Sequence, residues 1–400
     1  DNNENKVLNV PHLRFPEFTE EWEETTLGKI SEITKGSGIS KDQLSEQGSP
    51  CILYGELYTK YKSEIIDEVY SRTELDSSSL VKSKANDVII PCSGETAIDI
   101  STARCVPFNN ILLGGDLNII RLKHDDGGFF AYQLNGARKK DIARVAQGVS
   151  VVHLYGENLK HIRVYHPAIE EQKKITRLLS LIDERIATQN KIIEKLQSLI
   201  KGLIDDIITL KCGQLVAFET LYSKAGEGGT PTTSNTEFYD NGSIPFIKID
   251  DLSNKYLSAN KDYITELGLK KSSAWLIPTH SIIYSNGATI GAISINKYPV
   301  CTKQGILGIV PNTNIDVEFL YYFMQSSYFQ KEVERVVTEG TMKTAYLKDI
   351  NHIKCPIPDL DRQKEISHLL SVLSLKEDVE RQLLQKYQIQ KQYLLRKMFI

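Results

Sequence analysis

Few side chains in this 400-residue sequence have the types and spacing that catalysis requires. The one pair that resembles a nuclease site, Glu171 and Lys173, falls where the first turns of a helix are expected. Acidic side chains at that end of a helix interact favourably with its dipole, so we interpret the pair as a solvated helix face rather than a metal site. His161 and His352 have no matching nucleophile and are interpreted as packing residues where a domain meets a helix.

Other sequence motifs of enzymes are missing. The chain has no G-x-x-x-x-G-K phosphate loop and no intact G-x-G-x-x-G fingerprint. Without a Pro-Pro dipeptide it cannot carry the Asn-Pro-Pro-aromatic box of adenine-modifying methyltransferases. The six cysteines are widely separated and form no C-x-x-C pair, which argues against a zinc site or a disulfide framework. We therefore expect a chain that is not itself an enzyme and that binds no cofactor and no metal.

The composition is that of a globular protein, with 41% hydrophobic and 25% charged residues, and the length predicts two or three domains. The 48 basic and 51 acidic residues give a net charge of −3, which excludes a uniformly basic protein that coats nucleic acid. A local basic groove remains possible, because net charge does not report charge distribution. Reduced cysteines, a polar amino terminus without a signal core and the lack of an apolar run of ~18 residues predict a cytosolic protein with no membrane contact.

The most distinctive chemistry lies in segments rich in Gly, Ser, Thr, Asn, Lys and Gln. They form four blocks in order, within residues 228–252, 285–291, 303–305 and 339–366. Loops of this composition bring the backbone close to a ligand and present hydrogen-bond donors to phosphates or base edges. For any single block taken alone, ordinary turn chemistry is the favoured interpretation.

The chain repeats itself. An offset of 191 residues carries residues 158–163 onto 349–354 and Leu178-Leu179-Ser180 onto Leu369-Leu370-Ser371. Upstream the similarity is weaker, but residues 89–96 still resemble residues 282–289. A period this long indicates a duplicated domain rather than a solenoid. Two copies in one chain can be arranged about a pseudo-twofold axis, as the subunits of a dimer would be.

Each repeat begins with a β-rich part of about 150 residues. Runs of β-branched and aromatic residues separated by turn residues predict strands there. The expected strands lie at 87–90, 111–113, 118–121, 244–249, 281–284, 292–295 and 306–310. Residues 129–134 and 319–324 are expected to form short helices at matched positions of the two copies.

Each repeat ends in a long amphipathic helix that starts after Pro167 or Pro358. In the first, a seam with alternating steps of four and three residues indicates a coiled coil. Its positions are Ile175, Leu179, Ile182, Ile186, Gln189, Ile193, Leu196, Ile200, Leu203 and Ile207. In the second, the expected seam contains Ile366, Leu370, Leu373, Val379, Leu383, Leu384, Tyr387, Leu394 and Met398, and Glu377 and Glu380 interrupt it. Such rods need a partner, and the simplest partner for each is the other, packed antiparallel.

Taken in order, the blocks resemble the target-recognition domains and conserved helices of specificity subunits of type I restriction-modification enzymes. The opening residues 11–30, the central Gly148 and residues 167–175 resemble the same subunits, so the resemblance covers nearly the whole chain. The first half departs at residues 54–58, and at 114–116 Gly-Gly-Asp stands where the second half has Lys303-Gln304-Gly305. A domain that reads a different half-site is expected to differ there.

The resemblance implies an α+β fold, with two globular β-rich target-recognition domains related by internal duplication and separated by two long antiparallel coiled-coil helices. The implied boundaries are 1–167 for the first domain, 168–211 for the central spacer helix, 212–357 for the second domain and 358–400 for the carboxy-terminal spacer helix. It implies a non-catalytic subunit whose domains each read one half of a bipartite double-stranded DNA target. Two methylation subunits and restriction motor-nuclease subunits are the implied partners, and they would methylate adenine and cleave DNA.

Loop residues of both halves are therefore candidates for DNA contact. The set is Lys35, Tyr54, Tyr58, Lys60, Lys62, Ser93, Thr96, Lys139, Lys140, Ser150, Thr230, Thr232, Lys248, Asn286, Thr289, Lys303, Gln304, Thr341 and Lys343. Each lysine is also consistent with a solvated surface position, and each polar residue with an ordinary turn. The alternative function for the whole chain is a coiled-coil scaffold whose globular ends bind proteins without DNA specificity.

Overall fold

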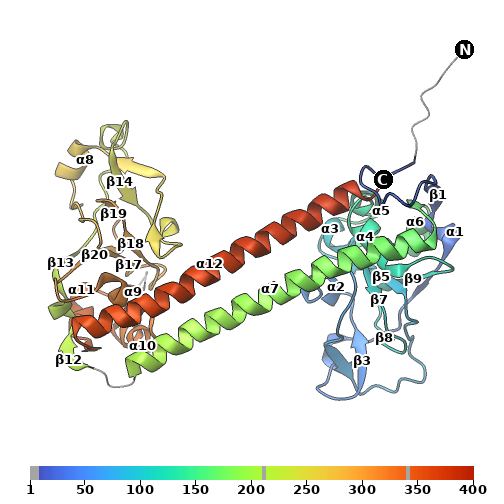
Figure 1. The fold of residues 1–400 in the computed structure, drawn as a ribbon, viewed down its shortest axis with the longest axis horizontal. Helices are drawn as coiled ribbons and strands as arrows, with labels where there is room; N and C mark the ends of the chain where they lie inside the picture. The colour runs from blue at the N-terminus through green and yellow to red at the C-terminus, as the bar shows by residue number, and fades with distance from the viewer. Residues whose placement is uncertain (1–8, 210–212, 339–342) are drawn as a thin grey trace, which may run out of the picture. The chain divides into compact units, whose positions relative to one another are not determined.

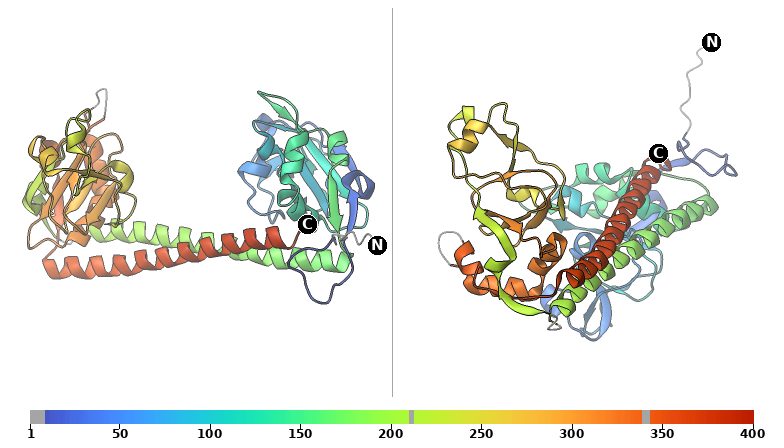
Figure 2. Two further views of the ribbon diagram at one scale, coloured as in Figure 1. Left: turned by 90° about the horizontal axis from the view of Figure 1, so that it is seen from above. Right: turned by 60° about the vertical axis from the view of Figure 1, so that its left-hand side comes forward.

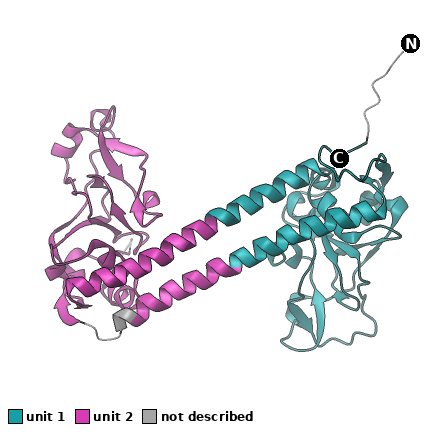
Figure 3. Cartoon of the chain, in the orientation of Figure 1, with its two compact units in different colours: residues 1–190, 382–400 teal, residues 191–381 magenta. Residues whose placement is uncertain are grey.

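The computed structural model describes residues 9–209, 213–338 and 343–400, with side chains described up to 206 in the first range. The chain divides into two compact units, residues 1–190 with 382–400 (unit 1) and residues 191–381 (unit 2) (Figure 3). Each unit contains one β-rich domain and one end of each of two long helices (Figures 1 and 2).

The long helices are α7 (Ile169–Thr209) and α12 (Leu360–Lys397). In unit 1 the beginning of α7 packs with the end of α12, and the Arg185 guanidinium lies 6.0 Å from the ring centre of Tyr387. In unit 2 the end of α7 and the beginning of α12 share a core through Ile204 and Leu370. The two helices are therefore antiparallel, as expected.

The expected seam of α7 is buried or half-buried at every position whose side chain is described, including Gln189, whereas the side chain of Ile207 lies outside the described residues. In α12 the expectation was wrong at Val379, which is 54% exposed. Glu377 and Glu380 are half-buried instead, so they continue the seam rather than interrupt it. The seam of α12 therefore keeps its alternating steps of four and three residues, even where polar side chains occupy its positions.

The first β-rich domain is built on a four-stranded antiparallel sheet in the order β2-β9-β5-β7 and a three-stranded sheet in the order β4-β3-β8. Two pairs, β1-β11 and β10-β6, complete it. The strands are β1 (Glu23–Thr26), β2 (Ser31–Lys35), β3 (Ser49–Ile52), β4 (Ser71–Thr73), β5 (Asp87–Pro91), β6 (Ser93–Gly94), β7 (Arg104–Val106), β8 (Leu112–Leu113), β9 (Leu117–Leu122), β10 (Val152–His153) and β11 (Arg163–His166). The helices are α1 (Leu27–Ile30), η1 (Lys41–Gln43), α2 (Glu56–Thr59), α3 (Ala97–Ile100), α4 (Gly127–Asn135), α5 (Lys139–Val145) and α6 (Gly156–Lys160).

The second domain has a five-stranded sheet in the order β13-β20-β17-β18-β15, a three-stranded sheet in the order β16-β14-β19 and the pair β12-β21. The strands are β12 (Gln214–Ala217), β13 (Tyr222–Glu227), β14 (Ile244–Ile247), β15 (Tyr256–Leu257), β16 (Asp262–Ile264), β17 (Ile282–Ser285), β18 (Ile293–Asn296), β19 (Cys301–Thr302), β20 (Ile306–Pro311) and β21 (Lys354–Ile357). The helices are η2 (Phe218–Leu221), η3 (Thr236–Phe238), η4 (Ile249–Asp251), α8 (Glu266–Lys270), α9 (Val317–Gln325), α10 (Ser327–Val336) and α11 (Leu347–Ile350).

The duplication is visible in these elements. The offset of 191 residues relates the starts of β1 and β12, of β2 and β13, of β11 and β21, and of α7 and α12. In each domain a buried helix, α4 or α9, covers the large sheet and contacts the long helices through one apolar core. Both short helices were expected from the sequence.

All seven expected strands are present, and each differs from its expected range by one or two residues at one or both ends. The strand expected at 244–249 ends at Ile247, because the next residues form η4, whose Asp251 carboxylate accepts the Lys248 N–H at 2.9 Å. The strand expected at 111–113 starts at Leu112. Polar side chains that bond to the backbone shorten such runs, an effect that β-propensity does not include.

Candidate nucleic-acid interface

In unit 2 the ordered blocks meet where three strands end or begin. The N–H groups of Asn286 and Gly287 donate to the carbonyl of Gly305 at 3.1 and 3.3 Å. The Gln304 N–H donates to the Thr230 hydroxyl at 3.4 Å. The Ala345 N–H donates to the carbonyl of Asn286 at 2.8 Å. Segments far apart in the sequence thus form one junction, which brings Thr230, Asn286 and Gln304 together.

Glycine is required at this junction because backbones approach closely. A Cβ on Gly228 would lie 2.1 Å from the carbonyl oxygen of Thr302, closer than real Cβ atoms approach another atom. Gly305 has a φ of +86°, in the left-handed region that favours glycine. The loops are therefore held by main-chain packing, which leaves the outward side chains of Lys303 and Gln304 exposed.

Unit 1 contains the same junction. A Cβ on Gly36 would lie 2.0 Å from the carbonyl oxygen of Gly114. The Cys92 N–H donates to the carbonyl of Asp116 at 2.6 Å, and the Leu154 N–H donates to the carbonyl of Cys92 at 2.7 Å. Asp116 has a φ of +57° and occupies the turn that Gly305 occupies in unit 2. The sequence departure at 114–116 therefore changes the side chains but keeps the turn.

A hollow of about 860 Å³ lies beside this junction in unit 1, lined in part by Tyr54, Glu56, Lys60 and Asp116. The loop that carries the tyrosines is fixed by Glu56, whose carboxylate accepts the Leu53 N–H at 2.9 Å and the Lys60 Nζ at 2.6 Å. Glu56 is only 5% exposed. Lys60 therefore has a structural partner in addition to its proposed role.

The candidate residues differ in exposure. The exposed candidates are Lys35, Lys60, Lys62, Thr96, Lys140, Ser150, Thr232, Thr289, Lys303, Gln304 and Lys343. The half-buried candidates are Tyr54, Tyr58, Lys139, Thr230 and Lys248. Ser93 is buried and donates to the Asp116 carboxylate at 3.1 Å, and Asn286 is buried with its Nδ2 donating to the carbonyl of Ala345 at 3.1 Å. Thr341 and the rest of segment 339–342 lie outside the described residues.

Some candidates are engaged within the protein. Lys248 pairs with Asp262 at 2.9 Å, and the Lys139 Nζ donates to the Thr102 hydroxyl at 3.3 Å. Burial and the nearby Arg104 lower the pKa of Lys139. Thr96 is the N-cap of α3, where its hydroxyl oxygen accepts the Asp99 N–H at 3.1 Å. Contact between these three side chains and DNA stays a prediction.

The interpretation of Glu171 as a solvated residue was wrong. Glu171 is 1% exposed and receives two hydrogen bonds from the Arg14 guanidinium, at 2.8 and 2.7 Å. This bidentate pair ties the amino-terminal segment to the first turn of α7. His161 and His352 are both exposed, so their interpretation as packing residues was also wrong.

Cysteine chemistry finds no support in the described part of the chain. Burial raises the pKa of the Cys51, Cys92 and Cys301 thiols to about 11 and that of Cys105 and Cys355 to about 12. Such thiols stay protonated and unreactive near neutral pH. Among the described residues no three His, Cys, Asp or Glu side chains gather as a metal site would require.

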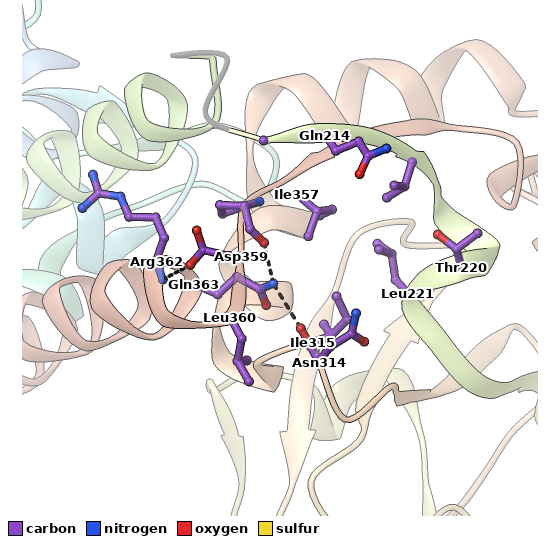
Figure 4. Close-up of a pocket in the computed structure, with 13 residues that line it drawn as sticks. Gln214, Thr220, Leu221, Asn314, Ile315, Ile357, Asp359, Leu360, Arg362 and Gln363 are labelled. Carbon is purple, nitrogen blue, oxygen red and sulfur yellow. Dashed lines mark hydrogen bonds between the residues drawn. The ribbon is translucent and has the colours of Figure 1, made fainter.

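A second hollow, of about 600 Å³, lies in unit 2 at the start of α12 (Figure 4). Its polar groups are used to hold the helix end. Asp359 accepts the Arg362 N–H at 2.9 Å, and Gln363 donates to the carbonyls of Asn314 and Pro358 at 3.2 and 2.9 Å. Gln172 makes the matched bond in unit 1, to the carbonyl of Pro167 at 2.8 Å. This hollow is therefore explained as a helix-start anchor.

None of the helices in the described part of the chain combines the length and apolar character needed to cross a membrane.

A family model, the type I restriction modification DNA specificity domain, matches residues 19–198 and again residues 222–387. The chain belongs to this specificity-domain family. The two matches coincide with the two copies of the duplication, so the specificity domain occurs twice.

Individual relatives agree with this assignment. The MjaVIII specificity subunit of a type I restriction enzyme from Methanocaldococcus jannaschii is 23% identical, over 95% of this chain and 91% of the relative. The crystal structure of the type I restriction-modification S subunit from M. genitalium is 17% identical with a TM-score of 0.62, covering 98% of this chain and 99% of that one. A chain from a structural study of type I complex assembly and conformational transition is 15% identical with a TM-score of 0.57, covering 94% of this chain and 97% of that one. At these identities the two structures support the specificity-subunit fold, with its paired domains and long helices.

Proposed function

We propose that this chain is the DNA-reading subunit of a type I restriction-modification enzyme and that each β-rich domain reads one half of a bipartite target. The observation that carries the proposal is the junction that occurs in both units with the same backbone contacts and different outward side chains. Lys303 and Gln304 occupy in unit 2 the turn that Gly114 and Gly115 occupy in unit 1. A shared frame with different side chains is what two readers of unlike half-sites require.

The long helices would set the gap between the half-sites. At ~1.5 Å per residue, the 41 residues of α7 measure roughly 60 Å along the helix. Half-sites on one face of a duplex are separated by whole turns of ~34–36 Å, a distance that a helix of this length can span.

Partner subunits complete the proposed function. The chain would direct two methylation subunits and the restriction motor-nuclease subunits to the target and would itself carry out no chemistry. With a net charge of −3, it would depend on these partners to neutralise part of the DNA phosphate charge. Tight binding of random DNA by the isolated chain at physiological salt would contradict this division of labour.

The test is selection of bound duplexes from a random library by the chain assembled with its methylation subunits. We expect enrichment of two short motifs separated by a fixed gap. Exchange of residues 1–167 with those of a homologue should change one motif only, and removal of seven residues from α7 should change the gap. A single continuous motif, or a change of both motifs after the exchange, would refute the proposal. A protein-binding scaffold, the alternative function, would show no salt-dependent DNA affinity.

A further inference from the structure

A short hairpin projects from unit 1 beside the candidate interface. Gln147 and His153 form its base, with reciprocal backbone hydrogen bonds of 2.9 and 2.7 Å. Its second strand, β10, pairs antiparallel with β6, which sets Val152 opposite Gly94 and His153 opposite Ser93. The hairpin is thus built directly onto one of the junction loops.

The base of the hairpin is held rigidly. Gly148 turns with a φ of +117°, and a Cβ there would lie 2.2 Å from the carbonyl oxygen of Val151. Just after the hairpin, the Leu154 carbonyl accepts the Asn118 Nδ2 at 2.9 Å, and Leu154 itself is 1% exposed. The hairpin therefore has a fixed direction.

The tip of this fixed hairpin is apolar. Val149 is 96% exposed and Val151 is 53% exposed, and the exposed Ser150 stands between them. An exposed valine at the tip of an anchored hairpin gains nothing for folding, because its methyl groups remain in water. The apolar side chain and fixed position of Val149 suit a ligand that presents an apolar group at one defined point.

We propose that Val149 contacts the C5 methyl group of a thymine in the major groove of the first half-site. This assignment rests on the proposed function. Among the edges of the four bases in the major groove, the thymine methyl is the apolar group, and aliphatic side chains contact it. Ser150, one residue away, is placed to hydrogen-bond a neighbouring base or phosphate. Sequence reasoning selected Ser150 and missed Val149, because a valine in a Val-rich run is typical of a buried strand.

Unit 2 has the matched hairpin base, with Thr338 and Thr344 joined by backbone bonds of 3.0 and 3.4 Å. Residues 339–342, between these two threonines, are not among the described residues. The thymine contact is therefore assigned to the first half-site alone.

The experiment uses the full chain with its methylation subunits on its own bipartite duplex. Each thymine of the first half-site, on either strand, is replaced in turn by deoxyuridine, which lacks only the C5 methyl group. We expect one replacement to weaken binding roughly three- to fivefold, the value of one buried methyl contact. Val149→Ala should weaken binding to the thymine duplex by a similar factor and should abolish the effect of deoxyuridine at that position.

Deoxyuridine scanning of the second half-site is the internal control. Each replacement there should weaken binding by the same factor in the wild-type and Val149→Ala complexes. Two outcomes overturn the inference and leave the proposed function standing, provided that the wild-type complex binds a bipartite motif. In the first, no deoxyuridine replacement in the first half-site weakens binding. In the second, a replacement weakens binding by the same factor in Val149→Ala as in the wild type. Loss of methylation-subunit assembly in Val149→Ala, without a uridine effect, would assign the tip to a protein contact instead. Failure of the wild-type complex to bind a bipartite motif would refute the proposed function itself.

Discussion

Lys391 of α12 carries its charge between two buried carboxylates in unit 1. Its Nζ lies 2.5 Å from Glu64 Oε2 and 2.6 Å from Asp183 Oδ1, and its side chain is 15% exposed. The Tyr132 hydroxyl donates to the other oxygen of Asp183 at 2.7 Å. Burial alone would lower the pKa of Lys391, but Glu64 and Asp183 together raise it above its ordinary value. The ammonium therefore stays charged in the folded protein.

Lys391→Met removes this charge and leaves both carboxylates without their shared partner. Breaking a buried ion pair from one side costs about 3–5 kcal/mol. We expect the free energy of unfolding to fall by about 3 kcal/mol, the lower end of that range. Tyr132 still donates to Asp183, and the buried Arg104 still attracts Glu64. The end of α12 is expected to detach from unit 1 first, since Lys391 is its polar anchor there.

The assay is urea unfolding followed by Trp22 fluorescence in a Trp275→Phe background, which leaves one tryptophan. Trp22 is 2% exposed and packs edge-on against Phe399, just beyond α12, so it reports docking of the helix end. With a slope of about 2–3 kcal/mol per molar urea, the midpoint should fall by roughly 1–1.5 M. Lys386→Met, at an exposed position of the same helix, is the matched control and should shift it little.

A second variant tests the cause. Lys391→Met combined with Glu64→Gln and Asp183→Asn removes the charges of Lys391 and of both its carboxylate partners. The Arg104 guanidinium keeps its hydrogen bonds to the carbonyls of Leu57 and Tyr61, at 3.0 and 2.8 Å, so the triple variant should recover part of the lost stability. A Lys391→Met midpoint equal to that of Lys386→Met would refute the reasoning, as would a triple variant less stable than the single one. Hydrogen exchange in strands β17 and β20 of unit 2 should not change in any of these proteins.

Three further outcomes are expected. Gly228→Ala places a Cβ 2.1 Å from the Thr302 carbonyl oxygen. In methylation assays, recognition of the second half-site should therefore be weakened more than about tenfold. Weaker recognition of the first half-site would contradict the modular account. The hydrogen bond with Asp125, at 3.2 Å, outweighs burial and raises the pKa of His166. Its stabilisation is therefore full below pH 6.5 and is lost as the pH rises through the raised native pKa, so thermal unfolding of His166→Gln should depend less on pH across that range. Lys303→Ala should weaken binding to all sequences alike and reduce the slope of log affinity against log salt by about one, whereas a loss confined to one motif would mark a base contact.

Periodicity and repetition predicted the architecture well, because burial repeats along a helix whatever the loops do. The duplication, both long helices and the helices at 129–134 and 319–324 are confirmed. Glu171 and Lys391 were misjudged because each is a charged residue buried against a partner distant in sequence. Glu171 looked solvated because Arg14 lies 157 positions away, and Lys391 did not look like a seam residue because Glu64 lies 327 positions away. Pattern reading assigns charged residues to the surface and cannot supply such pairs.

The candidate site was harder to predict than the fold, because its geometry comes from backbone contacts between loops. One hydrogen bond shows what these contacts demand. The carbonyls of Leu154 and Ala345, which are matched in the repeat, each accept an asparagine Nδ2, from Asn118 at 2.9 Å and from Asn286 at 3.1 Å. The two asparagines are not matched, since Asn118 lies in β9 and Asn286 follows β17.

The same bond is therefore supplied from two different places in the fold. This is expected if the segment before α6 or α11 must be held at the junction, whichever residue holds it. Such a requirement falls on backbone positions and leaves outward side chains such as Lys303 and Gln304 free to differ from Gly114 and Gly115. A new half-site specificity then needs new side chains on the same turns, and the frame that holds those turns does not have to refold.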